Sequence, residues 1–175
     1  MTPLHNSDEI QQRVQALARQ INSDYAGREL DIVYLVNGAS VFCADLVRHL
    51  TVPVRIHPFG FTSYANPSPS GEVRITLDIV EPLQGRHVLM VEGIVVSGRT
   101  PKYVAALLQL RQPISFAICA LGVKRKALAV DLPIQYVGFE FGPEIVIGYG
   151  VGEGSEKALP HLLPRSKTTS SLSGR

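Results

Sequence analysis

Apolar and polar positions along this chain alternate between a helical and a strand-like period. The first helical stretch is marked by four apolar residues at the spacing of one helix face: Ile10, Val14, Leu17 and Ile21. Asn6 and Glu9 form the sequence of a capping box just before it. We therefore predict a first helix from Ser7 to Ser23, ending before Gly27.

Further along the chain, short apolar runs alternate with further helical stretches. The segments predicted as strands are 32–36, 52–56, 73–77, 88–91, 114–121, 135–139 and 145–149, and the later helices are predicted over 40–50 and from Pro101 to Leu108. Phe61 to Gly71 is rich in polar and turn-forming residues and is predicted as a loop, of a length that is often functional. The alternation predicts an α/β fold: a twisted, mainly parallel sheet with helices on both faces. We also expect a small hood formed by the chain ends.

Length and composition predict the domain organisation. A chain of 175 residues that is 45% hydrophobic suits one compact domain, which we place at residues 1–164. From residue 165 onward the sequence is polar and low in complexity, so residues 165–175 are predicted to be a disordered tail.

Charge and cysteine content narrow the partners and the compartment. A net charge of +2 gives no reason to expect a nucleic-acid partner, and no apolar run is long enough to span a membrane. The first residues lack the plan of a signal peptide, and Cys43 and Cys119 lie in apolar surroundings, typical of two buried thiols. A disulfide between them stays a less favoured alternative. The expected location is the cytoplasm, and the dispersed histidines predict no zinc site.

The stretch from His87 to Leu108 carries the clearest chemistry. Val88 to Val91 is a continuous apolar run suited to a strand covered on both faces, and Pro101 is suited to the first turn of a helix. Between them, Gly98 permits a backbone conformation that side chains disfavour. We expect Thr100 to cap the helix, whose free amide groups would then face an anion held in the loop.

This stretch resembles the phosphoribosyl pyrophosphate signature of type I phosphoribosyltransferases. Glu92, Ser97, Gly98 and Thr100 match that signature, whereas Gly93 and Val96 stand where it normally has aspartates. Segments elsewhere resemble the hypoxanthine-guanine branch of the family, in the right order: YLVNGASVFCADLVRHL, FTSYANPSPSGEVRI, GVKRKA, VDLPIQYVGFE and EIVIGYG.

The resemblance implies a ligand and the residues that bind it. It implies binding of phosphoribosyl pyrophosphate or a purine mononucleotide, with the 5′-phosphate held by Ser97, Gly98, Arg99 and Thr100. Glu92 matches the acid that contacts ribose, and Lys124 matches the lysine that recognises the exocyclic oxygen of a 6-oxopurine. Ile145 replaces the aromatic residue that stacks on the base, and Val146 would offer backbone groups to its edge. The alternative for Lys124 is a solvated charge in a basic run.

The resemblance also implies a pyrophosphate side, a metal and a lid. Its residues here are Asn37, Gly38 and Lys157 on the pyrophosphate side, Glu92 and, more weakly, Glu153 toward Mg²⁺, and Ser63 with Tyr64 in a loop that closes over the reacting centre. An ordinary surface turn is the alternative for that loop. Relatives are usually dimers or tetramers, so a homodimer or homotetramer is expected.

The departures gather on the catalytic side. Val96 replaces the aspartate that exchanges a proton with the purine, and Gly93 replaces the second acid of the signature. Asn37 replaces a lysine, Gly152 replaces an acid on the metal side, and Thr62 stands where a lysine is frequent. A general acid or base is typically worth about 10²–10⁴ in rate, so its loss slows turnover but spares binding.

Three hypotheses follow. The first is a hypoxanthine or guanine phosphoribosyltransferase in which Glu92 holds ribose and the Ser97–Thr100 loop holds the phosphate. The second is a non-catalytic protein of the same fold that senses or sequesters a nucleotide. The third is a transferase for another acceptor that needs no help from residue 96.

Overall fold

The computed structural model describes residues 2–36, 38–63 and 73–165. In chain order its elements are α1 (Ser7–Asp24), β1 (Leu30–Leu35), α2 (Ser40–Arg48), β2 (Val54–Ser63), β3 (Val73–Leu77), β4 (His87–Val95), α3 (Arg99–Gln109), β5 (Ser115–Val123), η1 (Arg125–Ala127), β6 (Tyr136–Glu140), β7 (Val146–Ile147), η2 (Gly154–Ala158) and β8 (Leu163–Pro164).

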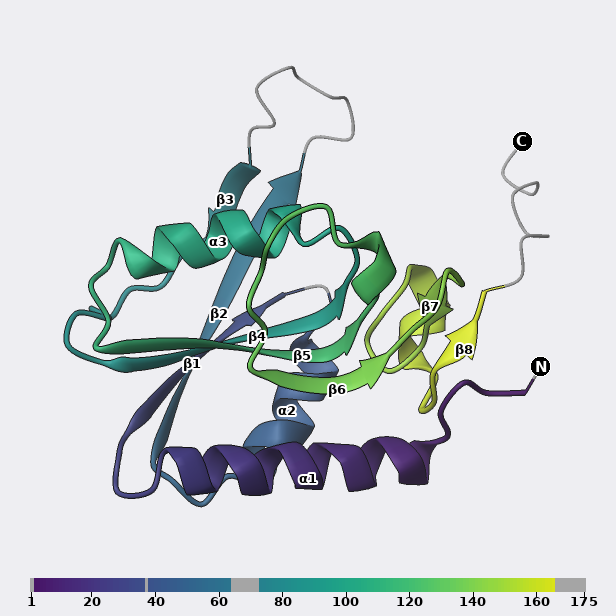
Figure 1. Ribbon diagram of the computed structural model, residues 1–175, viewed down its shortest axis with the longest axis horizontal. Helices are drawn as coiled ribbons and strands as arrows, with labels where there is room; N and C mark the ends of the chain where they lie inside the picture. Colours follow the sequence, from purple (N-terminus) through teal and green to yellow (C-terminus); the bar gives the residue numbers. More distant parts are fainter. Residues whose placement is uncertain (1, 37, 64–72, 166–175) are drawn as a thin grey trace.

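A six-stranded sheet in the order β3-β2-β1-β4-β5-β6 forms the centre of the molecule (Figure 1). Every neighbouring pair is parallel except β2 and β3, which are antiparallel. The predicted α/β fold with a mainly parallel sheet is confirmed. The chain moves outward from β1 to β2 and β3, and then returns to place β4 on the other side of β1.

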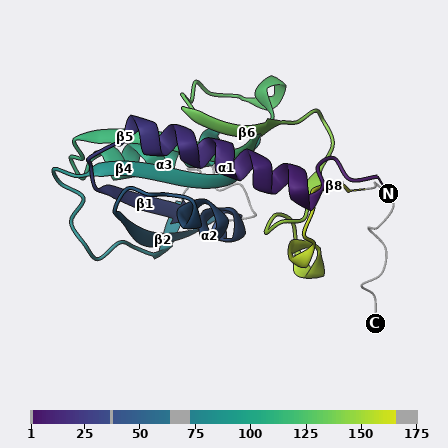
Figure 2. The same ribbon diagram turned by 90° about the horizontal axis from the view of Figure 1, so that it is seen from below.

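Helices cover both faces of this sheet. Figure 2 shows α1 and α2 together on one face, and Figure 1 shows α3 on the other. Each face has its own apolar core: α1 and α2 pack on residues such as Ile32, Leu89 and Cys119, while α3 packs on Val33, Met90 and others. Because the central strands are buried on both faces, their sequences are mostly apolar.

The first helix forms where its sequence predicts. Both hydrogen bonds of the capping box are present: the amide of Glu9 donates to Asn6 Oδ1 and the amide of Asn6 donates to Glu9 Oε2, each at 2.9 Å. The four apolar residues at helical spacing are all buried against the sheet, together with Ala18. The predicted end at Ser23 is one residue short of the observed end at Asp24.

The edge of the sheet differs from the prediction. β2 runs to Ser63, seven residues beyond the predicted end at Ile56, so Phe61 to Ser63 is strand and not loop. The strand continues through Pro58, which has no N–H to donate, because β3 pairs with β2 only from Gly60 onward. The remainder of the predicted loop, residues 64–71, lies outside the described residues.

Both ends of the described chain meet in a small hood beside the sheet (Figure 2). β7 and β8 pair antiparallel there, and the amide of Leu4 donates to the carbonyl of Leu162 at 2.8 Å. The expected hood from the chain ends is therefore confirmed. Arg165, the first residue of the predicted tail, is held by its amide on the carbonyl of Ile145 at 2.7 Å; residues 166–175 lie outside the described part.

Both cysteines are buried free thiols, as predicted. Burial raises the pKa of Cys43 to about 12 and the pKa of Cys119 further still. Within the described ranges, no helix combines the length and the apolar character needed to cross a membrane.

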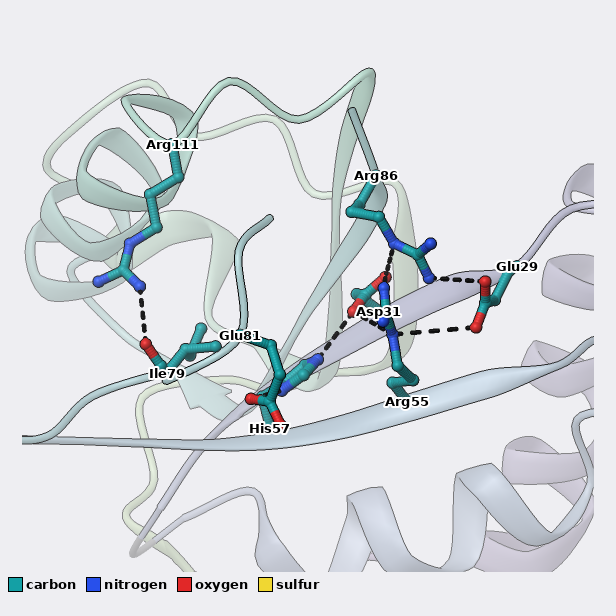
Figure 3. Close-up of polar contacts among 8 residues, drawn as sticks. All are labelled: Glu29, Asp31, Arg55, His57, Ile79, Glu81, Arg86 and Arg111. Carbon is teal, nitrogen blue, oxygen red and sulfur yellow. Dashed lines mark hydrogen bonds and ion pairs between the residues drawn. The ribbon is translucent and has the colours of Figure 1, made fainter. Parts of the chain in front are cut away.

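A buried carboxylate ties the amino ends of the central strands together (Figure 3). Asp31 on β1 is fully buried and accepts hydrogen bonds from Arg55 Nε at 3.1 Å, His57 Nε2 at 2.8 Å and Arg86 Nε at 2.8 Å. The other ring nitrogen of His57 lies 3.3 Å from a carboxylate oxygen of Glu81. The network therefore joins β1, β2 and the connection that returns to β4.

The donors around Asp31 outweigh its burial. Burial alone would raise the pKa of Asp31, but hydrogen bonds from Arg86, His57 and Arg55 hold this pKa below its usual value. Because the folded pKa is depressed, the stabilisation is present above the unfolded pKa of roughly 4 and is lost as the pH falls through the folded value.

Replacing Asp31 with Asn should lower the free energy of unfolding at neutral pH by about 3 kcal/mol, since two arginines lose a buried charged partner. The difference between the two proteins should shrink as the pH falls below about 4. Urea unfolding across this pH range measures both effects. Arg48→Gln is the control, because its side chain is 78% exposed and lies 3.9 Å from Asp45, so its loss should cost less than about 0.5 kcal/mol.

Candidate functional site

The candidate site lies at the carboxyl ends of the parallel strands. β1 and β4 are neighbours whose following connections leave in opposite directions, to β2 on one side and to β5 on the other. In an open α/β sheet this arrangement opens a crevice past the strand ends, where ligands bind. The loops that follow β1, β4 and β5 all begin at this edge of the sheet.

The loop after β4 has the shape that its sequence predicts. Gly98 adopts a left-handed conformation with φ 74°, and the amide of Arg99 reaches Ser97 Oγ at 3.4 Å. Gly98 is buried, whereas Arg99 is exposed and Ser97 and Thr100 are half-buried. The loop therefore presents hydroxyls and a guanidinium beside the N-terminus of α3, a combination suited to a phosphate group.

The predicted cap of α3 is wrong. The helix begins at Arg99, its N-cap is Gly98, and no side chain caps it. Thr100 lies inside the first turn, because the left-handed turn at Gly98 starts the helix one residue earlier than Thr100 would. Pro101 is in the first turn as predicted, where it lacks only an amide that has no partner within a helix.

A second surface shapes this loop. The amide of Ala129 donates to the carbonyl of Ser97 at 3.0 Å. A β-carbon added at Gly98 would lie 3.1 Å from Leu128 and 3.2 Å from Val130. Residues 128–130 therefore hold the loop of Ser97 and Gly98 in place from outside. Sequence reasoning missed this segment because nothing in its composition marks it as functional.

Glu92 and Gly93 face the loop after β1. The amide of Gly93 donates to Glu92 Oε1 at 2.8 Å, and a β-carbon at Gly38 would lie 3.7 Å from that oxygen. A β-carbon at Gly93 would lie only 2.5 Å from the carbonyl oxygen of Gly38. The loop after β1 thus packs closely on β4 at Gly93, and the chain has no room for an aspartate at position 93 unless the Gly38 loop moves.

The environment of Glu92 alters its acidity. Burial raises the pKa of Glu92 to about 7, against the opposing effect of the hydrogen bond from the Gly93 amide. The carboxyl group therefore changes its charge near neutral pH.

Lys124 anchors the next part of the crevice. Its amide donates to the carbonyl of Val95 at 2.9 Å, which places it directly beside the end of β4. The side chain is 8% exposed, and its ammonium donates to the carbonyl of Glu144. The alternative of a solvated charge is therefore excluded.

Apolar side chains flank this buried cation. Ile145 is 55% exposed and Val96 is 47% exposed, which is unusual for such residues, while Val146 is buried in the short strand β7. Exposed aliphatic side chains beside a buried ammonium group are suited to a flat, mostly apolar ligand that carries a hydrogen-bond acceptor. The predicted base-binding residues lie together in this way.

The hood carries the remaining predicted residues. Gly152 and Glu153 precede η2, where Glu153 is the exposed N-cap, and Lys157 lies inside η2. The carbonyl of Lys157 accepts the amide of Gly150 at 3.0 Å. Asn37 and Tyr64 lie outside the described residues, and Ser63 is described only as the last residue of β2.

Few carboxylates are available for a metal ion. Glu92 is at the strand ends and Glu153 is on the hood, and nowhere in 2–36, 38–63 or 73–165 do three or more metal-binding side chains come together. Mg²⁺ is usually held by one or two carboxylates together with substrate phosphates. This donor set fits a magnesium ion that arrives with a phosphorylated substrate, and it does not fit a metal held by the protein alone.

The sheet carries helices on both faces, and a loop suited to an anion follows β4, where the strand order reverses beside β1. This arrangement is typical of α/β proteins that bind a phosphorylated ligand. The family model for the phosphoribosyl transferase domain matches residues 2–153. The chain belongs to the phosphoribosyltransferase family, and its relatives are hypoxanthine and hypoxanthine-guanine phosphoribosyltransferases.

Two curated relatives illustrate the similarity. A hypoxanthine phosphoribosyltransferase of Haemophilus influenzae is 36% identical over 152 residues, which cover 85% of each chain. A hypoxanthine-guanine phosphoribosyltransferase of Dictyostelium discoideum is 38% identical over 160 residues, which cover 88% of this chain and 89% of the relative.

Solved structures agree on the fold. A hypoxanthine phosphoribosyltransferase from Staphylococcus aureus superposes with a TM-score of 0.92 at 28% identity, covering 98% of this chain and 94% of the other. A hypoxanthine-guanine phosphoribosyltransferase from Bacillus anthracis, with a HEPES molecule in its active site, gives 0.89 at 32% identity, covering 95% and 99%.

The charged form of Glu92 is expected to lower the free energy of unfolding at high pH, because its folded pKa of about 7 exceeds the usual value of 4.5. The folded state holds a proton that the unfolded state releases, so stability falls as the pH rises between these values. Glu92→Gln should therefore raise the free energy of unfolding by on the order of 1–2 kcal/mol at about pH 8 and leave it unchanged at about pH 5. Equal effects at both pH values in urea titrations would contradict the raised pKa.

Proposed function

We propose that the protein is a purine phosphoribosyltransferase that joins hypoxanthine or guanine to phosphoribosyl pyrophosphate and releases pyrophosphate, a reaction of purine salvage. The observation that carries the proposal is the pairing of an anion loop, Ser97 to Thr100, with the buried ammonium of Lys124 across the ends of β4 and β5. The first would hold the 5′-phosphate and the second the exocyclic oxygen of a 6-oxopurine.

Each remaining residue has a role that its position supports. Glu92 would accept hydrogen bonds from the ribose hydroxyls in its carboxylate form. Ile145 and Val146 would contact the base by its face and by backbone groups, since one is exposed and the other forms β7. An aliphatic side chain covers a base face with weaker stacking than an aromatic ring.

The pyrophosphate side is proposed to use Asn37, Gly38 and Lys157. Ser63 and Tyr64 would form a lid that excludes water while the bond breaks. Mg²⁺ would be held by the substrate phosphates together with Glu92 and, weakly, Glu153, and it would neutralise charge that develops on the leaving group.

Val96 sets the expected rate. An aliphatic side chain beside the base can neither accept nor return a proton, so the transfer lacks a contribution that is typically worth about 10²–10⁴. The phosphate loop is intact, so binding should be nearly unaffected. We therefore expect a slow transferase with ordinary nucleotide affinity.

Transfer is favoured over a purely nucleotide-sensing role. The relatives reported above are all transferases, and they match this chain along most of its length. We also propose that the protein is a cytoplasmic homodimer or homotetramer. A study of a Trypanosoma cruzi hypoxanthine phosphoribosyl transferase concerns its oligomeric state, which supports assembly as a property of such relatives.

Pyrophosphate release tests the function directly. The protein is incubated with phosphoribosyl pyrophosphate, magnesium and hypoxanthine, guanine or xanthine in turn, and calorimetry with the matching mononucleotides is run in parallel. Release with hypoxanthine or guanine supports the proposal. Tight mononucleotide binding without pyrophosphate release in the presence of any of the three bases would contradict the transferase proposal and support a nucleotide sensor.

The phosphate loop can be tested with two matched glycines. Gly98 and Gly27 share φ 74°, so an alanine at either position should cost stability by about 1 kcal/mol. Only Gly98 is packed against the segment 128–130; a β-carbon at Gly27 meets nothing within 4 Å. Gly98→Ala should weaken mononucleotide binding in calorimetry by roughly tenfold or more, while Gly27→Ala leaves it unchanged. Equal affinities would place the phosphate elsewhere.

Val96→Asp should raise the turnover number, by up to about 100-fold, because it adds a proton carrier next to the base. The exposed position leaves space for the new carboxylate. Val96→Asn is the matched control, since it has the same shape but does not titrate. A gain in both variants, measured by steady-state kinetics, would mean that polarity rather than proton transfer limits the rate.

A further inference from the structure

The hood loop of residues 145–154 carries the proposed base contacts at one end and Glu153, proposed to lie toward Mg²⁺, at the other; the proposed pyrophosphate-side residue Lys157 follows in η2. We propose that Tyr149 is a positioning residue for both substrates, because its hydroxyl fastens this loop to Asp45 on α2. The inference rests on the proposed function for its meaning, although the fastening itself is a property of the fold.

The contact is short and partly buried, because Tyr149 is buried and Asp45 is partly exposed. Tyr149 is 5% exposed, and its hydroxyl donates to Asp45 Oδ2 at 2.5 Å. The same oxygen accepts Gln11 Nε2 at 2.8 Å. Burial, with Asp45 adding to it, raises the pKa of Tyr149, so the hydroxyl keeps its proton and remains a donor. One carboxylate oxygen thus joins α1, α2 and the hood.

The backbone around Tyr149 needs such a fastening. Tyr149 has φ 51°, a left-handed conformation that is rare for a residue with a large side chain. Four nearby glycines also have positive φ: Gly148, Gly150, Gly152 and Gly154. A loop so rich in glycine has many alternative conformations, so a specific contact must select one of them.

Close packing of the backbone at Gly148 and Gly150 restricts the loop to the conformation that the structure shows. A β-carbon at Gly148 would lie 2.0 Å from the carbonyl oxygen of His161, and one at Gly150 would lie 3.0 Å from the side chain of Val41. The loop is therefore pressed against the rest of the hood on one side and against α2 on the other. The hydrogen bond from the Tyr149 hydroxyl adds a polar contact between this loop and α2.

Backbone hydrogen bonds connect Tyr149 to both halves of the site. The amide of Tyr149 donates to Leu159 at 2.8 Å, and the amide of Gly150 donates to Lys157 at 3.0 Å. On the other side, the chain runs through β7 to Val146 and Ile145. α2 itself begins two residues after Gly38, so Asp45 also belongs to the helix that follows the pyrophosphate-side loop. A displaced Tyr149 would shift both sides together.

The fold contains a matched pair that serves as a control. Tyr136 on β6 is also 5% exposed, and its hydroxyl donates to Asp24 Oδ2 at 2.7 Å. Asp24 ends α1, near the amino end of the sheet and away from the crevice. Removing either hydroxyl deletes one partly buried hydrogen bond from a tyrosine to an aspartate, but only Tyr149 belongs to the hood loop.

The experiment compares Tyr149→Phe with Tyr136→Phe in the full chain. The melting temperatures of both variants should decrease by similar amounts. Only Tyr149→Phe should raise KM for the base and KM for phosphoribosyl pyrophosphate, each by roughly tenfold, as expected for losing a hydrogen bond to a charged group. Its kcat should change by less than about threefold, since the tyrosine contacts neither substrate. Asp45→Asn should raise both KM values, and adding Tyr149→Phe to it should add little.

Amide hydrogen exchange gives a readout that does not depend on activity. Exchange at residues 148–151 should be roughly tenfold or more faster in Tyr149→Phe and unchanged in Tyr136→Phe. If exchange at these residues is unchanged, the Tyr149–Asp45 hydrogen bond does not hold the loop, even if the wild-type protein is an active transferase. Faster exchange with KM values equal to those of Tyr136→Phe overturns the positioning role. A wild-type protein that releases no pyrophosphate rejects the proposed function alone, and the exchange result still decides the fastening.

Discussion

The structure depends on one constraint: β1 and β4 are parallel neighbours from which the chain continues in opposite directions. Neither following connection can cover the strand ends between them, so a crevice remains there. The loop after β1 packs closely on β4 there, at Gly38 and Gly93. The position of the site follows from strand order, before any particular side chain is considered.

Two buried charged groups of this fold, Asp31 and Lys124, are held by partners within the protein. Asp31 is buried at the amino ends of the strands and is surrounded by donors, which lower its pKa. Lys124 is buried at the carboxyl ends and bonded to a main-chain carbonyl. Glu92 is different, because burial raises its pKa to about 7 and only the Gly93 amide offsets this. Such a group is suited to meet the hydroxyls or metal of an incoming ligand rather than a partner within the protein.

The departures from the family signature have unequal consequences. A side chain at Gly93 would clash with the backbone of Gly38, so the glycine is part of how the loop after β1 packs on β4. Val96 is exposed and follows Val95, whose carbonyl accepts the amide of Lys124, so its side chain does not take part in the packing of the core. The loop proposed to hold the phosphate is separate from both. Under the proposed function, binding and proton transfer would therefore depend on different residues.

The sequence by itself determined the order of helices and strands and the turn at Gly98, since apolar periodicity, a capping box and a glycine act through local geometry. It also predicted Lys124 at the end of a strand, where its amide donates to the carbonyl of Val95 at the end of β4. Only the tertiary structure decided how far β2 and β4 extend, where α3 begins and that residues 128–130 pack on the Ser97–Gly98 loop, because these depend on contacts between distant segments. The bond from Tyr149 to Asp45 spans 104 positions of the chain, and its only local trace is a run of glycines.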